Sequence, residues 1–167
     1  ETVPTPLRKT RDPDVSYIAS AITEIGARLR EGQLVILGST TYPGTTHDFV
    51  IPLLEEAAEE RERRLEIGRD FGLAFAPERI DPGNTKFAVK DVPKVVGGET
   101  PLCTELARAV FDTVFEQTVP VSSTESAEMV KLLENTFRAI NIGLANEIAL
   151  MCERLGLDVW EAVSYTH

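Results

Sequence analysis

The sequence of 167 residues is poor in cysteine and histidine, and it has no long apolar run. Its two cysteines, Cys103 and Cys152, are too few for a disulfide framework or a zinc site. His47 and His167 lie far apart, and neither belongs to a cluster of cysteines and carboxylates, so we expect no metal site. No apolar run reaches the ~18 residues of a membrane-spanning helix, and the first residues contain no secretory signal core.

Positive charge is also scarce. Lysine and arginine total 17 against 27 aspartates and glutamates, which gives a net charge of −10. Nucleic acids and anionic membranes are bound by basic surfaces, so we expect neither as a partner. The low cysteine count favours a cytoplasmic protein. The phosphate-binding motifs G-x-G-x-x-G and G-x-x-x-x-G-K-[ST] are both missing, so the chain lacks the first turn of a Rossmann unit.

Short apolar runs alternate with helical patterns up to about residue 121. Strands are predicted over residues 33–37, 71–75, 94–96 and 118–121, and helices over 15–30, 47–67 and 101–116. Pro52 falls inside the second helical pattern, so that helix either kinks there or begins later. This order predicts an α/β fold, partial and Rossmann-like, with a mostly parallel sheet.

The pattern becomes helical throughout after residue 122. A long helix is predicted over 125–155, capped by Ser123 or Thr124 and ended by Gly156, and a further helix over 158–164. We therefore predict a domain over 1–122 and a helical region over 123–167. Residues 139–155 are apolar on nearly every face, so a second subunit or sequence outside this chain should cover them, with an ordinary core helix as the alternative.

Two polar loops follow predicted strands, where ligands of doubly wound sheets bind. The hydroxyls of residues 39–46, STTYPGTT, could hold a water or the phosphate or ribose of a cofactor; the alternative is a loop that caps the next helix. In residues 76–83, Glu78 and Arg79 stand between two prolines and could orient a water and an anion; the alternative is a surface turn.

A third cluster lies on the long helix. Lys131 and Asn135 are four residues apart and share a face, with Glu128 and Arg138 extending it into a polar stripe. A desolvated lysine has a lowered pKa and can act as a base, while an amide one turn away shares a hydroxyl or oxyanion. The alternative is an ordinary solvated helix face.

These clusters, in this order, resemble the UDP-glucose/GDP-mannose 6-dehydrogenase family. The matching strings are VPTPL (3–7), STTYPGTT (39–46), APERIDPGN (76–84), PKVVGG (93–98) and the stretch from SSTESAEMVKLLEN to DVWEAV (122–163). The resemblance covers essentially the whole chain. It is strongest toward the UDP-N-acetylglucosamine and UDP-N-acetylmannosamine 6-dehydrogenases.

The resemblance implies an NAD-binding Rossmann domain, a central helix at a homodimer interface as in the 6-phosphogluconate dehydrogenase type, and a later UDP-binding domain. NAD would oxidise the C6 alcohol of a UDP-sugar substrate to an acid in two hydride transfers. The glycine fingerprint would precede residue 1 and the nucleophilic cysteine would follow residue 167. We therefore expect this chain to be a part of the enzyme that is inactive alone.

Catalytic and cofactor-binding residues are also implied by the resemblance. Thr5 and Thr40 would contact NAD, and Thr40 could hold a catalytic water. Glu78 would position or activate water for hydrolysis. Lys131 would be the acid/base and oxyanion partner at C6, with Asn135 beside it.

The sugar-nucleotide site would be lined by Arg79, Ile80 and Arg138, together with Lys131 and Asn135. Arginines fit a pyrophosphate that the acidic chain as a whole would repel. UDP-glucose enzymes carry a second glutamate at the position of Pro82, and this departure fits the N-acetylhexosamine branch.

Two other functions stay open. Dehydrogenases of the 3-hydroxyacid type also carry Lys-x-x-x-Asn on a helix after a Rossmann domain and oxidise once, although the loops 39–46 and 76–84 argue against them. The chain could also be an inactive truncated scaffold that dimerises through residues 125–155.

Overall fold

The computed structural model describes residues 3–6, 9, 13–59, 65–79 and 89–164. Its contacts divide the chain into two compact units, Glu1–Leu132 and Leu133–His167. The predicted domain boundary near residue 122 stays a prediction.

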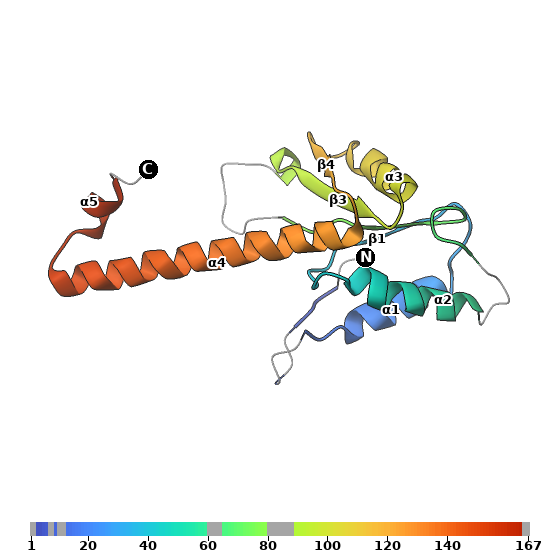
Figure 1. Ribbon diagram of the computed structural model, residues 1–167, viewed down its shortest axis with the longest axis horizontal. Helices are drawn as coiled ribbons and strands as arrows, with labels where there is room; N and C mark the ends of the chain where they lie inside the picture. Colours follow the sequence, from blue (N-terminus) through green and yellow to red (C-terminus); the bar gives the residue numbers. More distant parts are fainter. Residues whose placement is uncertain (1–2, 7–8, 10–12, 60–64, 80–88, 165–167) are drawn as a thin grey trace. The chain divides into compact units, whose positions relative to one another are not determined.

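The first unit is built on one four-stranded sheet (Figure 1). Its strands, in the spatial order β1-β2-β3-β4, are β1 (Leu34–Leu37), β2 (Gly72–Phe75), β3 (Lys94–Gly98) and β4 (Thr118–Pro120). The pairs β1–β2 and β3–β4 are parallel, and β2–β3 is antiparallel. All four predicted strands are present, and the prediction of a mostly parallel α/β sheet is confirmed.

Helices cover both faces of this sheet (Figure 1). The helices α1 (Ser16–Gly26) and α2 (Ile51–Glu59) pack on one face, and α3 (Pro101–Phe111) packs on the other. Alternate strand residues point to opposite sides, so β1, β2 and β3 each contribute side chains to two cores. The larger core holds buried apolar side chains of α1, α2 and three strands, among them Ile18, Ile22, Leu37, Leu54, Leu73, Phe75 and Val95.

The helix that contains Pro52 changes its pitch. A π-helical turn, η1 (Thr46–Val50), leads directly into α2, in which Pro52 is the second residue. Proline has no backbone N–H to donate, so the change of hydrogen-bonding pattern falls where a regular α-helical bond is missing. The helix therefore begins before Pro52, but as a wider turn.

The long helix α4 (Thr124–Leu155) begins where the sequence predicts, because Ser123 Oγ accepts the backbone N–H of Ser126 at 3.2 Å. Its first turn lies against β3. A Cβ atom on Gly97 would stand 2.1 Å from the carbonyl oxygen of Ser123, so only glycine permits this approach. The early residues Thr124, Ala127 and Glu128 are fully buried.

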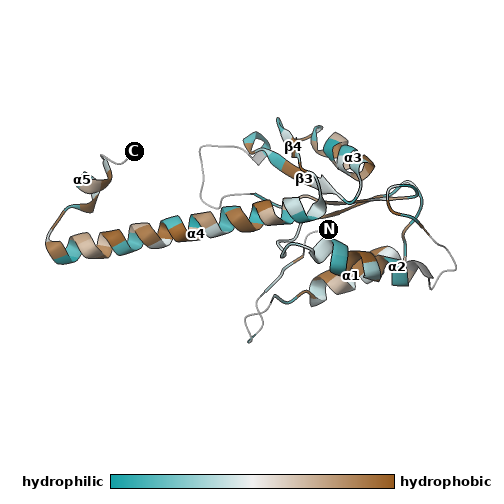
Figure 2. Cartoon of the chain, viewed as in Figure 1, coloured by the Kyte–Doolittle hydropathy of each residue, from teal (hydrophilic) through white to brown (hydrophobic). Residues whose placement is uncertain are grey.

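The second unit contains the rest of α4, from residue 133, and α5 (Val159–Ser164). Gly156, with φ of +69°, ends α4 as predicted. Many apolar side chains of this unit are exposed, including Phe137 at 70% and Ile140 at 65%, and brown apolar positions recur along α4 (Figure 2). Within the described ranges, no helix is both long and apolar enough to cross a membrane.

Candidate functional site

The two predicted cofactor-binding residues, Thr5 and Thr40, lie together. Thr5 Oγ1 donates a hydrogen bond to the carbonyl oxygen of Thr40 at 2.9 Å. The preceding residues are joined as well, because Ser39 Oγ accepts the N–H of Val3 at 2.8 Å and donates to its carbonyl at 3.0 Å. The N-terminal segment thus runs beside the loop at the carboxyl end of β1.

That loop contains one buried hydroxyl without a partner among the described residues. Thr40 is exposed, while Thr41 is buried and its Oγ1 has no hydrogen-bond partner among the described residues. A buried hydroxyl without a partner is costly and is normally satisfied by water or a ligand.

The middle of the loop is held by Glu128 of α4. Its Oε2 accepts the N–H of Gly44 at 2.6 Å, and its Oε1 accepts both the N–H and the hydroxyl of Thr46, at 2.9 and 2.7 Å. Burial raises the pKa of Glu128, and the hydrogen bonds from Thr46 and Gly44 oppose this rise. For Glu128, the alternative of a solvated helix face is wrong.

The same contact bears on the helix-capping alternative for this loop. Thr45 Oγ1 donates to the carbonyl of Tyr42 at 2.6 Å and does not cap η1. The amides at the start of η1 are satisfied instead by a carboxylate from a distant helix. Sequence reasoning missed this role, because nothing local to the loop predicts which residue will meet it.

The loop at the carboxyl end of β2 carries Glu78 and Arg79. Glu78 Oε1 accepts the backbone N–H of Arg79 at 2.7 Å, and Arg79 Nη1 donates to the carbonyl of Pro93 at 2.6 Å. The loop is thereby tied to the residue that precedes β3. Ile80, also predicted for the substrate site, lies outside the described residues.

A buried lysine lies beside this second loop. Lys94 Nζ donates to the carbonyl of Pro77 at 2.8 Å and stands 3.9 Å from Glu78 Oε2. It also lies over the rings of Phe111 and Phe115, 4.9 and 5.6 Å from their centroids. The sequence predicts a strand at Lys94 but no role for this residue, although a lysine at the start of an otherwise apolar strand is an available signal.

Lys131 is one of the charged groups that act on Lys94. Burial lowers the pKa of Lys94, Glu78 opposes that effect, and the positive charges of Lys131 and Arg79 lower it further. Lys131 is half-buried, and it belongs to the first unit with Glu78, Arg79 and Lys94.

The remaining predicted residues, Asn135 and Arg138, belong to the second unit and are exposed on α4. Cys103 and Cys152 are free and buried. Among the described residues, no group of three histidine, cysteine or acidic side chains could hold a metal ion.

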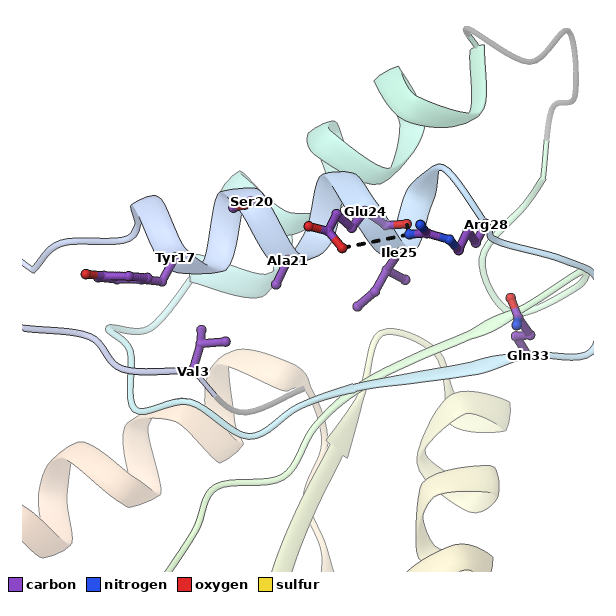
Figure 3. A pocket seen from close by; sticks show the side chains of 8 residues that line it. All are labelled: Val3, Tyr17, Ser20, Ala21, Glu24, Ile25, Arg28 and Gln33. Carbon is purple, nitrogen blue, oxygen red and sulfur yellow. Dashed lines mark hydrogen bonds and ion pairs between the residues drawn. The ribbon is translucent and has the colours of Figure 1, made fainter.

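A groove of about 470 Å³ lies along α1 (Figure 3). It is lined by Val3, Tyr17, Ser20, Ala21, Glu24, Ile25, Arg28 and Gln33. None of the predicted site residues lines it. The polar clusters after β1 and β2, rather than this groove, carry the candidate site.

Comparison with known proteins identifies two domains of one family. Residues 2–115 match the NAD binding domain of the UDP-glucose/GDP-mannose dehydrogenase family, and residues 125–167 match its central domain. The first match confirms the expectation of NAD at the level of the domain. The chain is 37% identical over 96% of its length to UDP-N-acetyl-D-mannosamine dehydrogenase of Yersinia pestis. It is 38% identical over 97% of its length to UDP-N-acetyl-D-glucosamine 6-dehydrogenase of Pseudomonas aeruginosa.

Solved structures agree with these matches. A UDP-D-ManNAc dehydrogenase from Pyrococcus horikoshii aligns with a TM-score of 0.84 and 38% identity over 96% of this chain. A GDP-mannose dehydrogenase from Pseudomonas aeruginosa aligns with a TM-score of 0.85 and 28% identity over 97% of it. The chain spans only 39% and 37% of the lengths of the two curated relatives, and 37% of each of these structures. It belongs to the UDP-glucose/GDP-mannose dehydrogenase family.

Proposed function

We propose that the full-length protein is an NAD-dependent 6-dehydrogenase of a UDP-N-acetylhexosamine, which oxidises the C6 alcohol to a uronate. The observation that carries this proposal is that Glu78, Arg79 and Lys94 lie after β2 at the same edge of the sheet as Thr40, the partner of Thr5, after β1. The chain's relatives act on UDP-N-acetylhexosamines. NAD would supply the hydride acceptor.

The chain's own residues would orient the substrate and move its protons. Lys131, near other positive charges, would hold the C6 hydroxyl and take its proton or stabilise the oxyanion. Asn135 would share that oxygen from the next helical turn. Thr40 would hold a water and, with Thr5, contact NAD, while Glu78 would position the water used in hydrolysis.

Substrate recognition would depend on Arg79, Ile80 and Arg138. A planar guanidinium binds phosphate oxygens through two parallel hydrogen bonds, which suits the pyrophosphate of a UDP-sugar. The net charge of −10 would repel this anion, so local arginines must supply the attraction.

The number of NADH molecules formed per sugar consumed tests this function. The full-length protein should form two NADH for each UDP-N-acetylglucosamine or UDP-N-acetylmannosamine oxidised. One NADH per sugar would favour a single-oxidation dehydrogenase of the 3-hydroxyacid type. Turnover of UDP-glucose alone would move the substrate to another branch of the family, and no turnover of any of these sugars would contradict the proposal.

A second copy of the chain would cover the exposed apolar part of α4, giving a homodimer. Phe137, Ile140 and Leu144 are exposed at 70%, 65% and 59%, and their spacing places them on one stripe. Phe137→Glu combined with Leu144→Glu should shift sedimentation toward monomer, whereas Asn146→Glu, at an exposed polar position, should not. A wild-type monomer at high concentration would contradict the dimer. The free, buried cysteines suit the reducing cytoplasm.

A further inference from the structure

Glu128 is a charged residue in the core to which no step of the proposed reaction gives a role. It is fully buried, and its partners lie more than 80 residues away in the sequence. Moving a carboxylate out of water costs several kcal/mol unless hydrogen bonds replace its hydration. An apolar residue would fill this place in the core without that cost, so the role of the carboxylate is to bind its hydrogen-bond donors.

Those groups all belong to the loop between β1 and α2. Both oxygens of Glu128 are used, on the N–H of Gly44 and on the N–H and hydroxyl of Thr46. Backbone N–H groups at a helix start have no partners within the helix, and they carry partial positive charge. Gly44 has φ of +93°, the left-handed conformation in which its own amide reaches Glu128. The carboxylate therefore caps η1 from another helix and fixes the loop.

The position of Glu128 on α4 joins two parts of the candidate site. Thr40 lies near the start of the loop that Glu128 holds, and Lys131 follows Glu128 by three residues on the same helix, within the first unit. A shift of the loop would therefore change the separation of Thr40 and Lys131.

We propose that Glu128 is a positioning residue. It fixes the loop 39–46 relative to Lys131, so that the cofactor-binding residue Thr40 and the base Lys131 are correctly spaced for the reaction. This inference rests on the proposed function for its kinetic consequence. The anchoring of the loop itself does not depend on which sugar is oxidised.

The kinetic test uses the full-length protein with Glu128→Gln and Thr46→Val. In Glu128→Gln an amide NH₂ replaces one oxygen and opposes a backbone N–H of the loop. Thr46→Val removes only the hydroxyl bond. A misplacement of about 1 Å costs on the order of 100-fold in rate, so kcat should fall about 100-fold in Glu128→Gln and less in Thr46→Val. Thr46→Ser should restore kcat, and Glu105→Gln, at an exposed position on α3, should leave it unchanged.

A second readout separates positioning from mere stability. With substrate deuterated at C6, the kinetic isotope effect on kcat should rise in Glu128→Gln and Thr46→Val, because hydride transfer becomes slower than the other steps. A merely structural role would lower the folded fraction and leave the isotope effect of the folded enzyme unchanged. Normal kcat and an unchanged isotope effect in folded Glu128→Gln would overturn the proposal. If that variant does not fold, the same result in Thr46→Val would do so.

Hydrogen–deuterium exchange of the peptide covering residues 39–50 gives a readout that needs no turnover. Exchange should be faster in Glu128→Gln, or in Thr46→Val if the first variant does not fold, than in wild type and Glu105→Gln. If the wild-type protein oxidises none of the sugars, the proposed function fails, but faster exchange in the variant than in wild type would still support the anchoring. Unchanged exchange would overturn the anchoring whatever the activity.

Discussion

The loops that follow β1 and β2 are each held by one buried charge, and the two charges have opposite signs. Glu128 holds the first loop through three hydrogen bonds from Gly44 and Thr46. Lys94 holds the second through one hydrogen bond to the carbonyl of Pro77. The sign of each charge matches the backbone groups that it binds. The first loop presents N–H groups at a helix start to a carboxylate, and the second presents a carbonyl oxygen to an ammonium group.

We call Glu128 and Lys94 the two anchors of these loops. They also differ in which charged groups they leave available for chemistry. Both oxygens of Glu128 are occupied inside the core, so this carboxylate can only hold the loop. Glu78 is exposed, and one of its oxygens lies 3.9 Å from Lys94. The buried positive charge of Lys94 attracts this exposed carboxylate and orients it. The first loop is thus built for rigidity, and the second for presenting a charged group.

The largest effect is expected from replacing Lys131. In Lys131→Ala, kcat should fall by about 100- to 1,000-fold, because the C6 oxygen loses its proton acceptor and electrostatic partner. The affinity for NAD should change little. Steady-state kinetics and NAD titration of the full-length protein measure both, with Lys90→Ala, an exposed lysine paired with Glu116, as the control. Near-normal turnover would remove Lys131 from the mechanism.

The strands and most of the helices could be predicted because their signals are local. Thr100, for example, accepts the N–H of Cys103 at 3.2 Å and caps α3 in front of Pro101, as that pair of residues predicts. The predicted helix over 15–30 was too long, because α1 ends at Gly26. A Cβ atom on Gly26 would stand 2.6 Å from Ala57 Cβ, so the end of α1 is packed closely against α2.

The anchors could not be predicted, because they depend on contacts between distant residues. Glu128 falls in a polar stripe on a helix, and that pattern is typical of a solvated face. Its partners stand 82 and 84 residues earlier, and no spacing rule joins them. Thr5 and Thr40 were assigned to one ligand by family resemblance alone, and the hydrogen bond that joins them is a contact across 35 residues.

Lys94→Met should have the next largest effect and would test whether the second anchor matters to Glu78. Met keeps the length of the buried chain but cannot donate to the Pro77 carbonyl, and a buried unpaired acceptor costs about 1–3 kcal/mol. Removing a buried charge offsets part of that loss, so we expect a net destabilisation of about 1 kcal/mol. Glu78 loses its positive neighbour, so kcat should fall about tenfold.

Urea denaturation and steady-state rates of the full-length protein measure the two effects of Lys94→Met. Lys90→Met, which removes an exposed lysine four residues before Lys94, should change neither stability nor kcat. An unchanged kcat in Lys94→Met would show that Glu78 is placed without help from Lys94.

Gly44→Ala should have a smaller effect, confined to the first anchor. A left-handed φ of +93° costs alanine about 1–2 kcal/mol, and the new Cβ would stand 2.9 Å from Asp48 Oδ2. Gly32→Ala is a matched control, because Gly32 also has a positive φ, +77°, but its Cβ would meet nothing within 4 Å. Both variants should lose stability in denaturation, but only Gly44→Ala should lose turnover, by a few fold. Equal turnover in the two would contradict a link between Gly44 geometry and the site.

The smallest effect is expected from the exposed contact between the end of the first loop and the residue after β3. His47 Nδ1 lies 2.8 Å from Glu99 Oε1, and that hydrogen bond is the main reason that the pKa of His47 is raised above its ordinary value of 6.5. A raised pKa in the folded state means that the contact stabilises fully below the unfolded value and loses this effect as pH rises through the folded value. The wild-type protein should therefore have a larger free energy of unfolding than His47→Gln, and this difference should be greater at about pH 6 than at about pH 8. The difference should stay below about 1 kcal/mol, because His47 is more than half exposed. A pH-independent difference would mean that charge contributes nothing to this contact, whereas a difference as large as that of Lys94→Met would show that exposed pairs, as well as buried anchors, hold the loops.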